Sequence, residues 1–377
     1  MLTRLSQSES NFLVEQLLTW FRTTKRDLPW RQTYDPYHVW ISEIMLQQTQ
    51  MERGVAYFLR WIERFPSVGE VACASEDDIL VYWEGLGYYA RARNLHRAAQ
   101  EIVGKYSGKV PADYETLLNL PGIGPYTAAA VASIAGNQDV VVVDANVNRM
   151  FARIFDIDEP VKDRGVQKQV HQLASELLPR GKARIFNQAL MDFGGLVCTP
   201  KAPHCKSCRV QRLCSAYQRG TVSFRPVLKS ARKVVLLTRV VAVILCEGKV
   251  FMQKRESSAV WGGLWEFPGG ETLTGNSSGD ELDLVAEVNY DTALRVIKEN
   301  FLVEVQHQYT HHKVSLLSFV CRLQDEDRQQ PTLKSAASFA WVTPLEMDAL
   351  PCPSGVRKII KYMKKQRPEM FTANYAA

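Results

Sequence analysis

Four cysteines lie in the stretch CTPKAPHCKSCRVQRLC, residues 198–214 of the chain. Their spacing, C-x6-C-x2-C-x5-C, places four thiols in a segment short enough to surround one compact metal centre. Thiolates are the ligands that iron–sulfur clusters require. Zinc is the alternative, but zinc ribbons usually use two C-x2-C pairs held well apart. The spacing predicts one 4Fe–4S cluster, with no disulfide framework, held by Cys198, Cys205, Cys208 and Cys214.

Length and composition bound the class of protein. A chain of 377 residues is too long for one ordinary hydrophobic core, so two or three domains are expected. The formal net charge of +6 is mildly basic, which permits a polyanionic partner without requiring one. No apolar run is long enough to span a bilayer, and the first residues lack the order of a signal peptide. We therefore expect a soluble protein of a reducing compartment, with no membrane partner.

The periodicity of apolar residues divides the chain into two regions. Helical spacing dominates the first, with helices expected at residues 12–21, 36–48, 55–64, 76–83, 90–106, 113–118, 126–135 and 145–154. Residues 219–233 are basic and contain no Asp or Glu, which is typical of an interdomain linker. Beyond them, strands are expected at residues 234–246, 249–254, 314–323 and 339–342, and a helix at residues 291–299. The prediction is a mostly α domain at 1–218, a linker at 219–233 and an α+β domain at 234–377.

A sharp break interrupts the helical region at Leu120-Pro121-Gly122-Ile123-Gly124-Pro125. The two glycines allow a tight backbone turn, and Pro125 suits the first turn of the helix that follows. Amide groups at the start of a helix bind phosphate readily. The pattern indicates a helix-hairpin-helix motif, which grips a DNA backbone without reading its sequence. An ordinary glycine-rich turn between two helices is the alternative.

Two carboxylates stand where they suit catalysis. Glu43 lies within Trp40-Ile41-Ser42-Glu43-Ile44-Met45-Leu46, and these apolar neighbours would raise its pKa toward the range of a general acid. A solvated glutamate with no role is the alternative. Asp144 follows the valines at 140–143 and precedes a predicted helix. A helix cap is its ordinary role at such a place.

The stretches RDLPWR and WISEIMLQQTQ, residues 26–31 and 40–50, closely resemble MutY-type adenine DNA glycosylases. So do Gly85-Leu86-Gly87-Tyr88-Tyr89, the cysteine loop, and the interval from Gly124 to Asp144, and the resemblance covers essentially the whole chain. It implies a base-excision repair enzyme that hydrolyses the N-glycosidic bond of adenine mispaired with 8-oxoguanine or guanine in double-stranded DNA. It also implies a monomer in a bacterial cytoplasm, associated with the nucleoid.

The resemblance also assigns roles to residues. Glu43 corresponds to the acid that protonates adenine, and Asp144 to the carboxylate that stabilises the oxocarbenium-like sugar of the flipped nucleotide. Residues that support these two are Tyr126 and Asn146. Residues expected to contact the base or the DNA are Arg26, Leu28, Trp30, Arg31, Gln48, Leu86, Tyr88, Gly122, Gly124 and Gln188. For Gln48, Leu86 and Tyr88, packing in the protein core is the alternative.

One position separates two chemistries. Relatives of the endonuclease III type carry a lysine just after the hairpin, which forms a Schiff base with the sugar and cuts the strand. Here that position is Tyr126, which cannot form an imine. We therefore expect a monofunctional glycosylase. An endonuclease III-like glycosylase/lyase and a non-catalytic, DNA-bound iron–sulfur sensor are the alternatives.

The second region resembles the entrance of a Nudix hydrolase at GGLWEFPGGE, residues 262–271. An active Nudix enzyme would continue with an Arg-Glu-x-x-Glu-Glu run that binds metal. The matching place was expected at residues 294–300, LRVIKEN, which lack most of these acids, so pyrophosphate hydrolysis is not expected. The region instead resembles the 8-oxoguanine-sensing domain of the same family. That family's usual Phe-Ser-His loop is here Tyr309-Thr310-His311, and Ala145 replaces its usual glycine after the aspartate.

Overall fold

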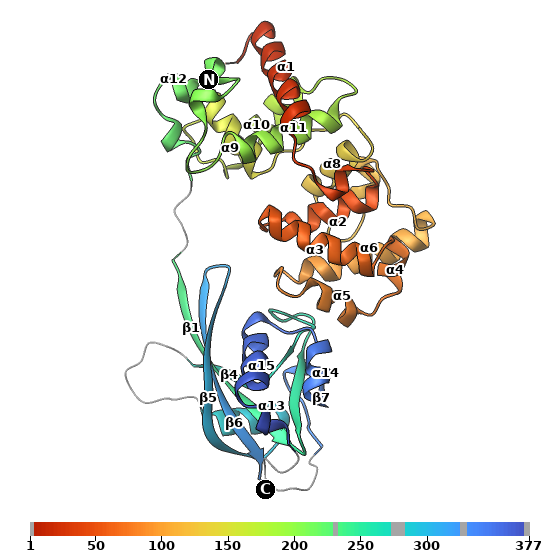
Figure 1. Ribbon diagram of the computed structural model, residues 1–377, viewed down its shortest axis with the longest axis vertical. Coiled ribbons are helices and arrows are strands. Elements are labelled where there is room, and N and C mark those ends of the chain that lie inside the picture. The colour runs from red at the N-terminus through yellow and green to blue at the C-terminus, as the bar shows by residue number, and fades with distance from the viewer. Residues whose placement is uncertain (1–3, 229–232, 273–282, 325–329, 373–377) are drawn as a thin grey trace. The chain divides into compact units, whose positions relative to one another are not determined.

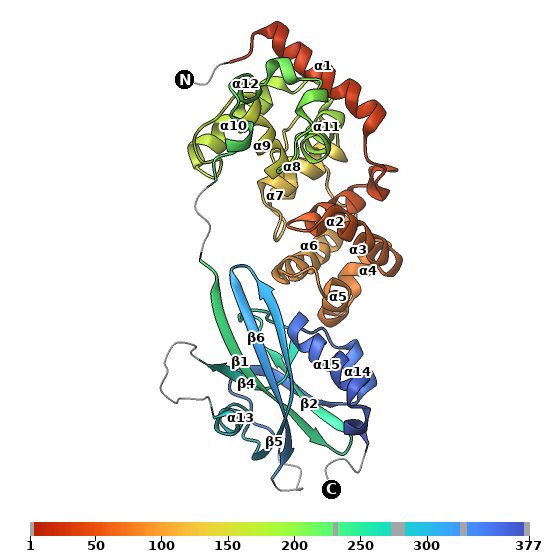
Figure 2. The ribbon, with the colours of Figure 1, turned by 60° about the vertical axis from the view of Figure 1, so that its left-hand side comes forward.

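The computed structural model describes residues 4–228, 233–272, 283–324 and 330–372. It divides into two compact units, one formed by Met1–Cys73 with Arg97–Ala231 and the other by Ala74–His96 with Arg232–Ala377. The first unit is helical, and the second combines a mixed β-sheet with helices (Figure 1, Figure 2). The predicted fold class is confirmed. Within the predicted linker, residues 229–232 lie outside the described part of the chain.

Among the described residues, ten α-helices that precede the cysteine loop have most or all of their residues in the first unit. They are α1 (Gln7–Thr24), α2 (Pro36–Leu46), α3 (Met51–Arg64), α4 (Val68–Cys73), α6 (Ala90–Tyr106), α7 (Tyr114–Leu118), α8 (Pro125–Ile134), α9 (Ala145–Ile154), α10 (Arg164–Leu177) and α11 (Ala183–Leu196). The short α12 (Ser215–Gln218) follows the cysteine loop. The eight helices predicted from the sequence are present, with ends shifted by a few residues.

One hydrophobic core cluster of the first unit lies between α1, α9, α10 and α11. Helix α1 begins with a capping box, in which Ser6 and Glu9 satisfy each other's backbone N–H groups. Its apolar face then recurs at helical spacing through Leu13 and Leu17, both fully buried. These side chains share one cluster with Phe151 of α9. The packing fixes α9, which carries Asp144 at its start, against α11.

The turn between α7 and α8 has the geometry expected of a helix-hairpin-helix motif. Gly122 has φ 73, a left-handed conformation that favours glycine. Gly124 is the N-cap residue of α8, and Pro125 follows it at the first helical position. The N-cap makes no side-chain hydrogen bond, so no side chain competes for the amides of the first turn.

The second unit is built on a seven-stranded sheet within the described residues. Its strands are β1 (Val235–Cys246), β2 (Lys249–Arg255), β3 (Trp265–Glu266), β4 (Gly269–Thr272), β5 (Val296–Tyr309), β6 (His312–Leu323) and β7 (Ala336–Val342). The main order is β3-β2-β1-β6-β5, with β4 beside β1 and β7 beside β2. Its helices are α5 (Glu76–Trp83), α13 (Leu284–Thr292), α14 (Pro344–Ala349) and α15 (Ser354–Gln366). Throughout the described residues, no helix has the length and apolar content that crossing a membrane requires.

Residues 240–245 of strand β1 are buried on both faces because helices cover both sides of the sheet. Val241 and Val243 point into the cluster that includes Ile359 of α15. Val240 and Ala242, on the opposite face, join the cluster that includes Val288 of α13. Because side chains on both faces of the sheet are buried, residues 240–245 form a continuous apolar run rather than alternating between apolar and polar.

The helix predicted at residues 291–299 is wrong. Helix α13 ends at Thr292, where Ala293 takes a left-handed conformation with φ 58, and β5 begins at Val296. Val296 pairs with Leu323 of β6, so sheet pairing overrides the local helical pattern. The place assigned to the Nudix metal-binding run therefore lies mainly on a strand. The complete sequence contains no Arg-Glu-x-x-Glu-Glu run.

Candidate active site

Glu43 is enclosed on α2. Its side chain is only 4% exposed, and the Tyr126 hydroxyl on α8 donates a hydrogen bond of 2.9 Å to its Oε2. Burial raises the pKa of Glu43 to about 7, assisted by the charge of Asp144 and opposed by the Tyr126 hydrogen bond and the charge of Arg31. The predicted desolvation of Glu43 is confirmed. A carboxyl group with this pKa is partly protonated at neutral pH and can donate a proton.

Tyr126 remains a neutral donor. Burial first, and then the charges of Glu43 and Asp144, hold its pKa well above the usual value. The phenol can therefore orient the Glu43 carboxyl group without losing its own proton over the physiological range.

Asp144 is partly buried and caps a helix. It is the N-cap residue of α9, and its Oδ1 accepts a hydrogen bond of 2.7 Å from the Val147 backbone N–H. Its Oδ2 accepts another, also 2.7 Å, from the Asn146 side-chain amide. Burial raises the pKa of Asp144, while these two donors oppose the rise by stabilising the carboxylate. The cap is thus present, and the two donors also fix the orientation of the carboxylate.

A buried arginine that was not identified from the sequence connects this carboxylate to the cysteine loop. Arg149 Nη2 donates to Asn146 Oδ1 at 2.9 Å and to the Gly194 carbonyl at 2.7 Å, while its Nε donates to the Cys198 carbonyl at 2.8 Å. A continuous chain of hydrogen bonds therefore runs from Asp144 through Asn146 and Arg149 to the first cysteine. The available sequence signal was Arg149 itself, which lies one helical turn after Asn146.

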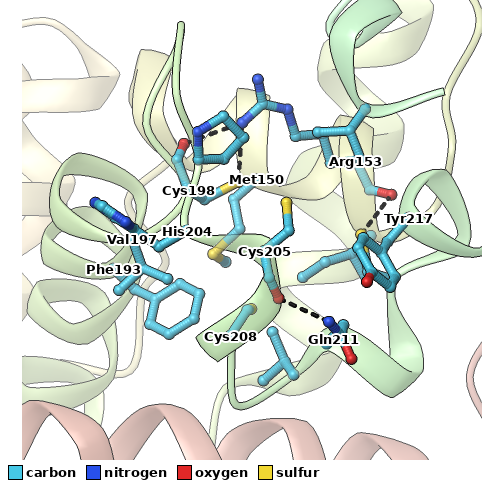
Figure 3. Close-up of a pocket in the computed structure, with 15 residues that line it drawn as sticks. Met150, Arg153, Phe193, Val197, Cys198, His204, Cys205, Cys208, Gln211 and Tyr217 are labelled. Carbon is cyan, nitrogen blue, oxygen red and sulfur yellow. Dashed lines mark hydrogen bonds between the residues drawn. The ribbon is translucent and has the colours of Figure 1, made fainter. Parts of the chain in front are cut away.

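The four predicted ligand cysteines line one cavity in the first unit, shown in Figure 3. Its remaining wall is largely apolar and includes Met150, Phe193 and Val197. All four cysteines are free thiols. Among the described residues, no group of three or more His, Cys, Asp or Glu side chains is arranged to hold a metal ion. The structure therefore gathers the four thiols around a shared space.

Arg153 holds the start of this cysteine loop. Its Nη1 donates to the Thr199 carbonyl at 2.8 Å. The same nitrogen donates to Cys198 Sγ at 3.3 Å (Figure 3). Its Nη2 donates to the Pro200 carbonyl at 3.1 Å. Arg153 is only 3% exposed, so these contacts are shielded from water.

The predicted base-contacting residues Arg26 and Arg31 share one acidic partner. Arg26 Nε donates to Asp192 Oδ1 at 2.8 Å, and Arg31 Nη1 donates to Asp192 Oδ2 at 2.6 Å. Asp192 is fully buried; burial alone would raise its pKa, but the hydrogen bonds and charges of the two arginines hold the pKa below its usual value. Asp192 was missed because it lies far from both arginines in the sequence.

The other residues predicted to surround the base are also buried or constrained. Leu28 is 5% and Trp30 4% exposed, and the Trp30 ring packs edge-on against Phe58 with centroids 5.1 Å apart. Gln188 is 1% exposed. Gln48 lies outside α2 in a left-handed conformation with φ 59. For a residue other than glycine, that conformation is uncommon and often accompanies a functional constraint.

Two groups of predicted DNA-contacting residues line a cavity of about 640 Å³ in the second unit. Leu86 and Tyr88 lie on one wall, and Tyr309 and Thr310 lie on another. Leu86 is 8% exposed, whereas Tyr88 is 47% exposed. The structure thus brings together two segments that are distant in the sequence.

Tyr309-Thr310-His311 lies at the tip of the hairpin between β5 and β6. Thr310 has φ 48, and the Tyr309 ring packs edge-on against Trp261 with centroids 4.7 Å apart. His311 contacts His312, with ring centroids 4.1 Å apart. His311 is not among the residues that line the cavity, whereas His312 is.

Comparison with protein families gives two matches. Residues 41–179 match the profile described as HhH-GPD superfamily base excision DNA repair protein. Residues 240–362 match the profile described as NUDIX domain.

Curated relatives match nearly the whole chain. Adenine DNA glycosylase of Rattus norvegicus is 31% identical over 404 residues, covering 93% of this chain and 78% of the relative. Adenine DNA glycosylase of Homo sapiens is 31% identical over 411 residues, covering 93% of this chain and 74% of the relative.

Solved structures match the helical region. A thermostable thymine-DNA glycosylase has a TM-score of 0.52 and 32% identity, covering 56% of this chain and 98% of that one. A non-covalent endonuclease III–DNA complex has a TM-score of 0.50 and 22% identity, covering 58% of this chain and 99% of that one, a likeness of fold alone.

Proposed function

Because this chain belongs to the family of adenine DNA glycosylases, we propose that it removes adenine from mispairs with 8-oxoguanine or guanine in double-stranded DNA. The observation that carries the proposal is the pairing of two carboxyl groups in different environments. Glu43 has a pKa of about 7, and Asp144 is held by two hydrogen-bond donors. Two carboxyl groups tuned apart supply an acid and an electrostatic stabiliser, as hydrolysis of a glycosidic bond requires.

The chemistry follows from these two environments. The adenine must leave the base stack before any side chain can reach it. Glu43 gives its proton to the base as the N-glycosidic bond breaks, so the electron pair of that bond leaves with a neutral adenine. The positive charge left on the sugar is stabilised by the Asp144 carboxylate. Water then adds to the sugar and loses a proton, which leaves an abasic site.

Gln188 supports the choice of adenine. Its Nε2 donates to the Arg184 carbonyl at 2.9 Å, so its Oε1 points away from that carbonyl. Within the described residues, its buried Oε1 has no hydrogen-bond partner. An unsatisfied buried acceptor suits the exocyclic amino group of adenine, which is a donor.

The proposed enzyme is monofunctional. Tyr126 occupies the position where a lyase carries its Schiff-base lysine, and its hydroxyl is engaged by Glu43. A phenol has no nitrogen with which to form an imine. The abasic product should therefore remain uncut until it is treated with alkali.

We propose that the second unit senses the oxidised base. The cavity lined by Leu86, Tyr88, Tyr309 and Thr310 supports this proposal because it combines aromatic rings with a hydroxyl group. Oxidised guanine differs from guanine only at the oxygen on position eight and the hydrogen on N7, so a reader needs hydrogen-bonding groups at that small edge. The domain boundaries at 218 and 234, the monomeric state and the bacterial, nucleoid-associated location stay predictions.

The test of substrate is a panel of duplexes with adenine opposite 8-oxoguanine, guanine, cytosine and thymine, assayed with and without alkali. We expect release from the first two only, and strand breaks only after alkali. Replacing Thr310→Val and His311→Ala together should reduce the preference for 8-oxoguanine over guanine by about 1–3 kcal/mol, the value of one good base contact. Strand cleavage without alkali would contradict the monofunctional assignment. Unchanged discrimination in the double variant would remove the hairpin from lesion sensing.

We propose that Cys198, Cys205, Cys208 and Cys214 hold a 4Fe–4S cluster. The donor set fits, because four thiols line one cavity with a mainly apolar wall. When bound, such a cluster would act as a structural centre that orders the loop. The basic side chains of that loop, which include Lys201, Lys206 and Arg212, are then expected to meet phosphate.

Replacing Cys208→Ser should remove the brown visible absorption expected of the cluster and weaken DNA binding and thermal stability together. The measurements are metal analysis, absorption spectra, melting temperature and binding to mispaired duplex. Cys73→Ser is the matched control, because Cys73 is exposed and lies outside the cavity. A colourless wild type with one zinc per chain would support the alternative metal and refute the cluster.

A further inference from the structure

The loop that carries Leu86 and Tyr88 is anchored at its first residue to helix α15. Glu84 ends α5 and directly precedes residues 85–88. Arg357 of α15 donates to Glu84 through Nε at 2.7 Å and through Nη2 at 2.8 Å. This two-point geometry is the strong, directional form of an arginine–carboxylate pair.

Both partners are fixed by further contacts. The Cys352 backbone N–H also donates to Glu84 Oε2, at 3.1 Å. Arg357 uses its other donors on the backbone carbonyls of Met347, at 3.0 Å, and Leu350, at 2.5 Å. The side chains are 14% and 20% exposed for Arg357 and Glu84. Because this ion pair is shielded from water and each partner makes further hydrogen bonds, it should contribute more to stability than an ion pair on the exposed surface.

The loop after Glu84 has a constrained backbone conformation. Gly85 and Gly87 have φ of 96 and 72, and Tyr88 has φ 49. The left-handed conformation is strained for tyrosine, and such strain concentrates at functional sites. The Gly87 carbonyl accepts from Trp83 Nε1 and from Arg91 Nη2, both at 3.1 Å. These hydrogen bonds therefore fix the conformation of the loop, which begins directly after Glu84.

Helix α15, which binds Glu84 through Arg357, also contacts the β5–β6 hairpin. Helix α15 begins at Ser354, which lines the same cavity as Tyr309 and Thr310. One residue after Arg357, Lys358 Nζ donates to the Gln306 carbonyl of β5 at 2.6 Å. Strand β5 ends at Tyr309. Neighbouring residues of α15 thus contact the hairpin strand on one side and Glu84 on the other.

We propose that Glu84 and Arg357 form a positioning pair that couples recognition of the opposite base by the β5–β6 hairpin to the placement of Leu86 and Tyr88. The inference rests on the proposed lesion-sensing role of the hairpin and deepens it. Neither residue lines the cavity that holds Tyr309 and Thr310. Their effect appears as the difference in rate between adenine opposite 8-oxoguanine and adenine opposite guanine, because only the oxidised base engages the hairpin fully.

The test is a double-mutant cycle in the full chain with Glu84→Gln, Arg357→Met and the double variant. Each single variant should lower the ratio of single-turnover rates on the two mispairs about tenfold, within the usual range of coupling between sites. The double variant should lose no more than either single variant. 2-Aminopurine beside the target adenine reports extrusion of the base, and its signal should fall on the 8-oxoguanine duplex alone. Arg357→Lys keeps the charge but not the two-point geometry, so it answers the same question if Arg357→Met does not fold.

Lys254→Met is the matched control. Lys254 Nζ forms an ion pair of 2.6 Å with Asp77 on the same helix α5, but at the end distant from the loop. This variant should keep the wild-type rate ratio. An equal loss of ratio in Lys254→Met, or a ratio within twofold of wild type in both Glu84→Gln and Arg357→Met, would overturn the coupling. A wild type without preference for 8-oxoguanine would instead overturn the lesion-sensing role itself.

Discussion

We expect Glu43→Gln to abolish measurable adenine release while binding to mispaired duplex persists. Glutamine preserves the shape of the side chain and can still accept the Tyr126 hydrogen bond, but it has no proton to give. General acid catalysis typically contributes 10²–10⁴-fold, so a loss of at least about that size is expected in the single-turnover rate. Retained turnover within about tenfold of wild type would show that another group protonates the base.

The pH dependence of the wild type checks the same assignment. The acid must be protonated, so the rate should fall as the pH rises through about 7. The Tyr126 hydrogen bond lowers the pKa of Glu43. Tyr126→Phe removes that bond, and the falling limb should therefore move to higher pH. A limb that stays in place would separate the titrating group from Glu43.

Replacing Asp144→Asn should lower the single-turnover rate by about 10²–10³-fold. That is the usual contribution of one group that stabilises a charged transition state electrostatically. Asparagine is about as good a helix N-cap as aspartate. The melting temperature should therefore change little, although the charge that faces the sugar is gone. Single-turnover rates and thermal unfolding of the same preparation measure the two effects.

Asp144→Ala is the paired variant, because it removes the cap as well as the charge. It should lose activity to a similar extent and also about 1 kcal/mol of stability. If Asp144→Asn retains activity and only Asp144→Ala is impaired, capping α9 is the whole role of Asp144.

What the sequence could predict was local. The apolar residues around Glu43 predicted its burial, and Gly122, Gly124 and Pro125 predicted the tight turn, because each depends on immediate neighbours in the chain. The loop Tyr309-Thr310-His311 was identified instead by its resemblance to the family's usual Phe-Ser-His loop. The catalytic roles of Glu43 and Asp144 came from family resemblance and stay predictions until the variants are measured.

What was missed depends on contacts between distant segments. Asp192 forms ion pairs with Arg26 and Arg31. Glu84 forms one with Arg357. The partners lie far apart in the sequence, so no local sequence pattern predicts these pairs. Residues 296–299 were predicted to continue a helix that begins at residue 291. Pairing with β6 makes them a strand instead. In each case long-range packing decided the outcome.

The division of the chain bears on how this protein is made. Residues of Ala74–His96 belong to the same compact unit as Arg232–Ala377, so the chain enters that unit, leaves it and returns. A ribosome releases the earlier segment long before Lys254 and Arg357, the partners of Asp77 and Glu84, have been synthesised. Domains generally fold as their residues emerge. Here the first unit can complete its fold once residues up to 231 have been synthesised. The loop that carries Leu86 and Tyr88, in contrast, gains its partner only when α15, near the end of the chain, has been synthesised.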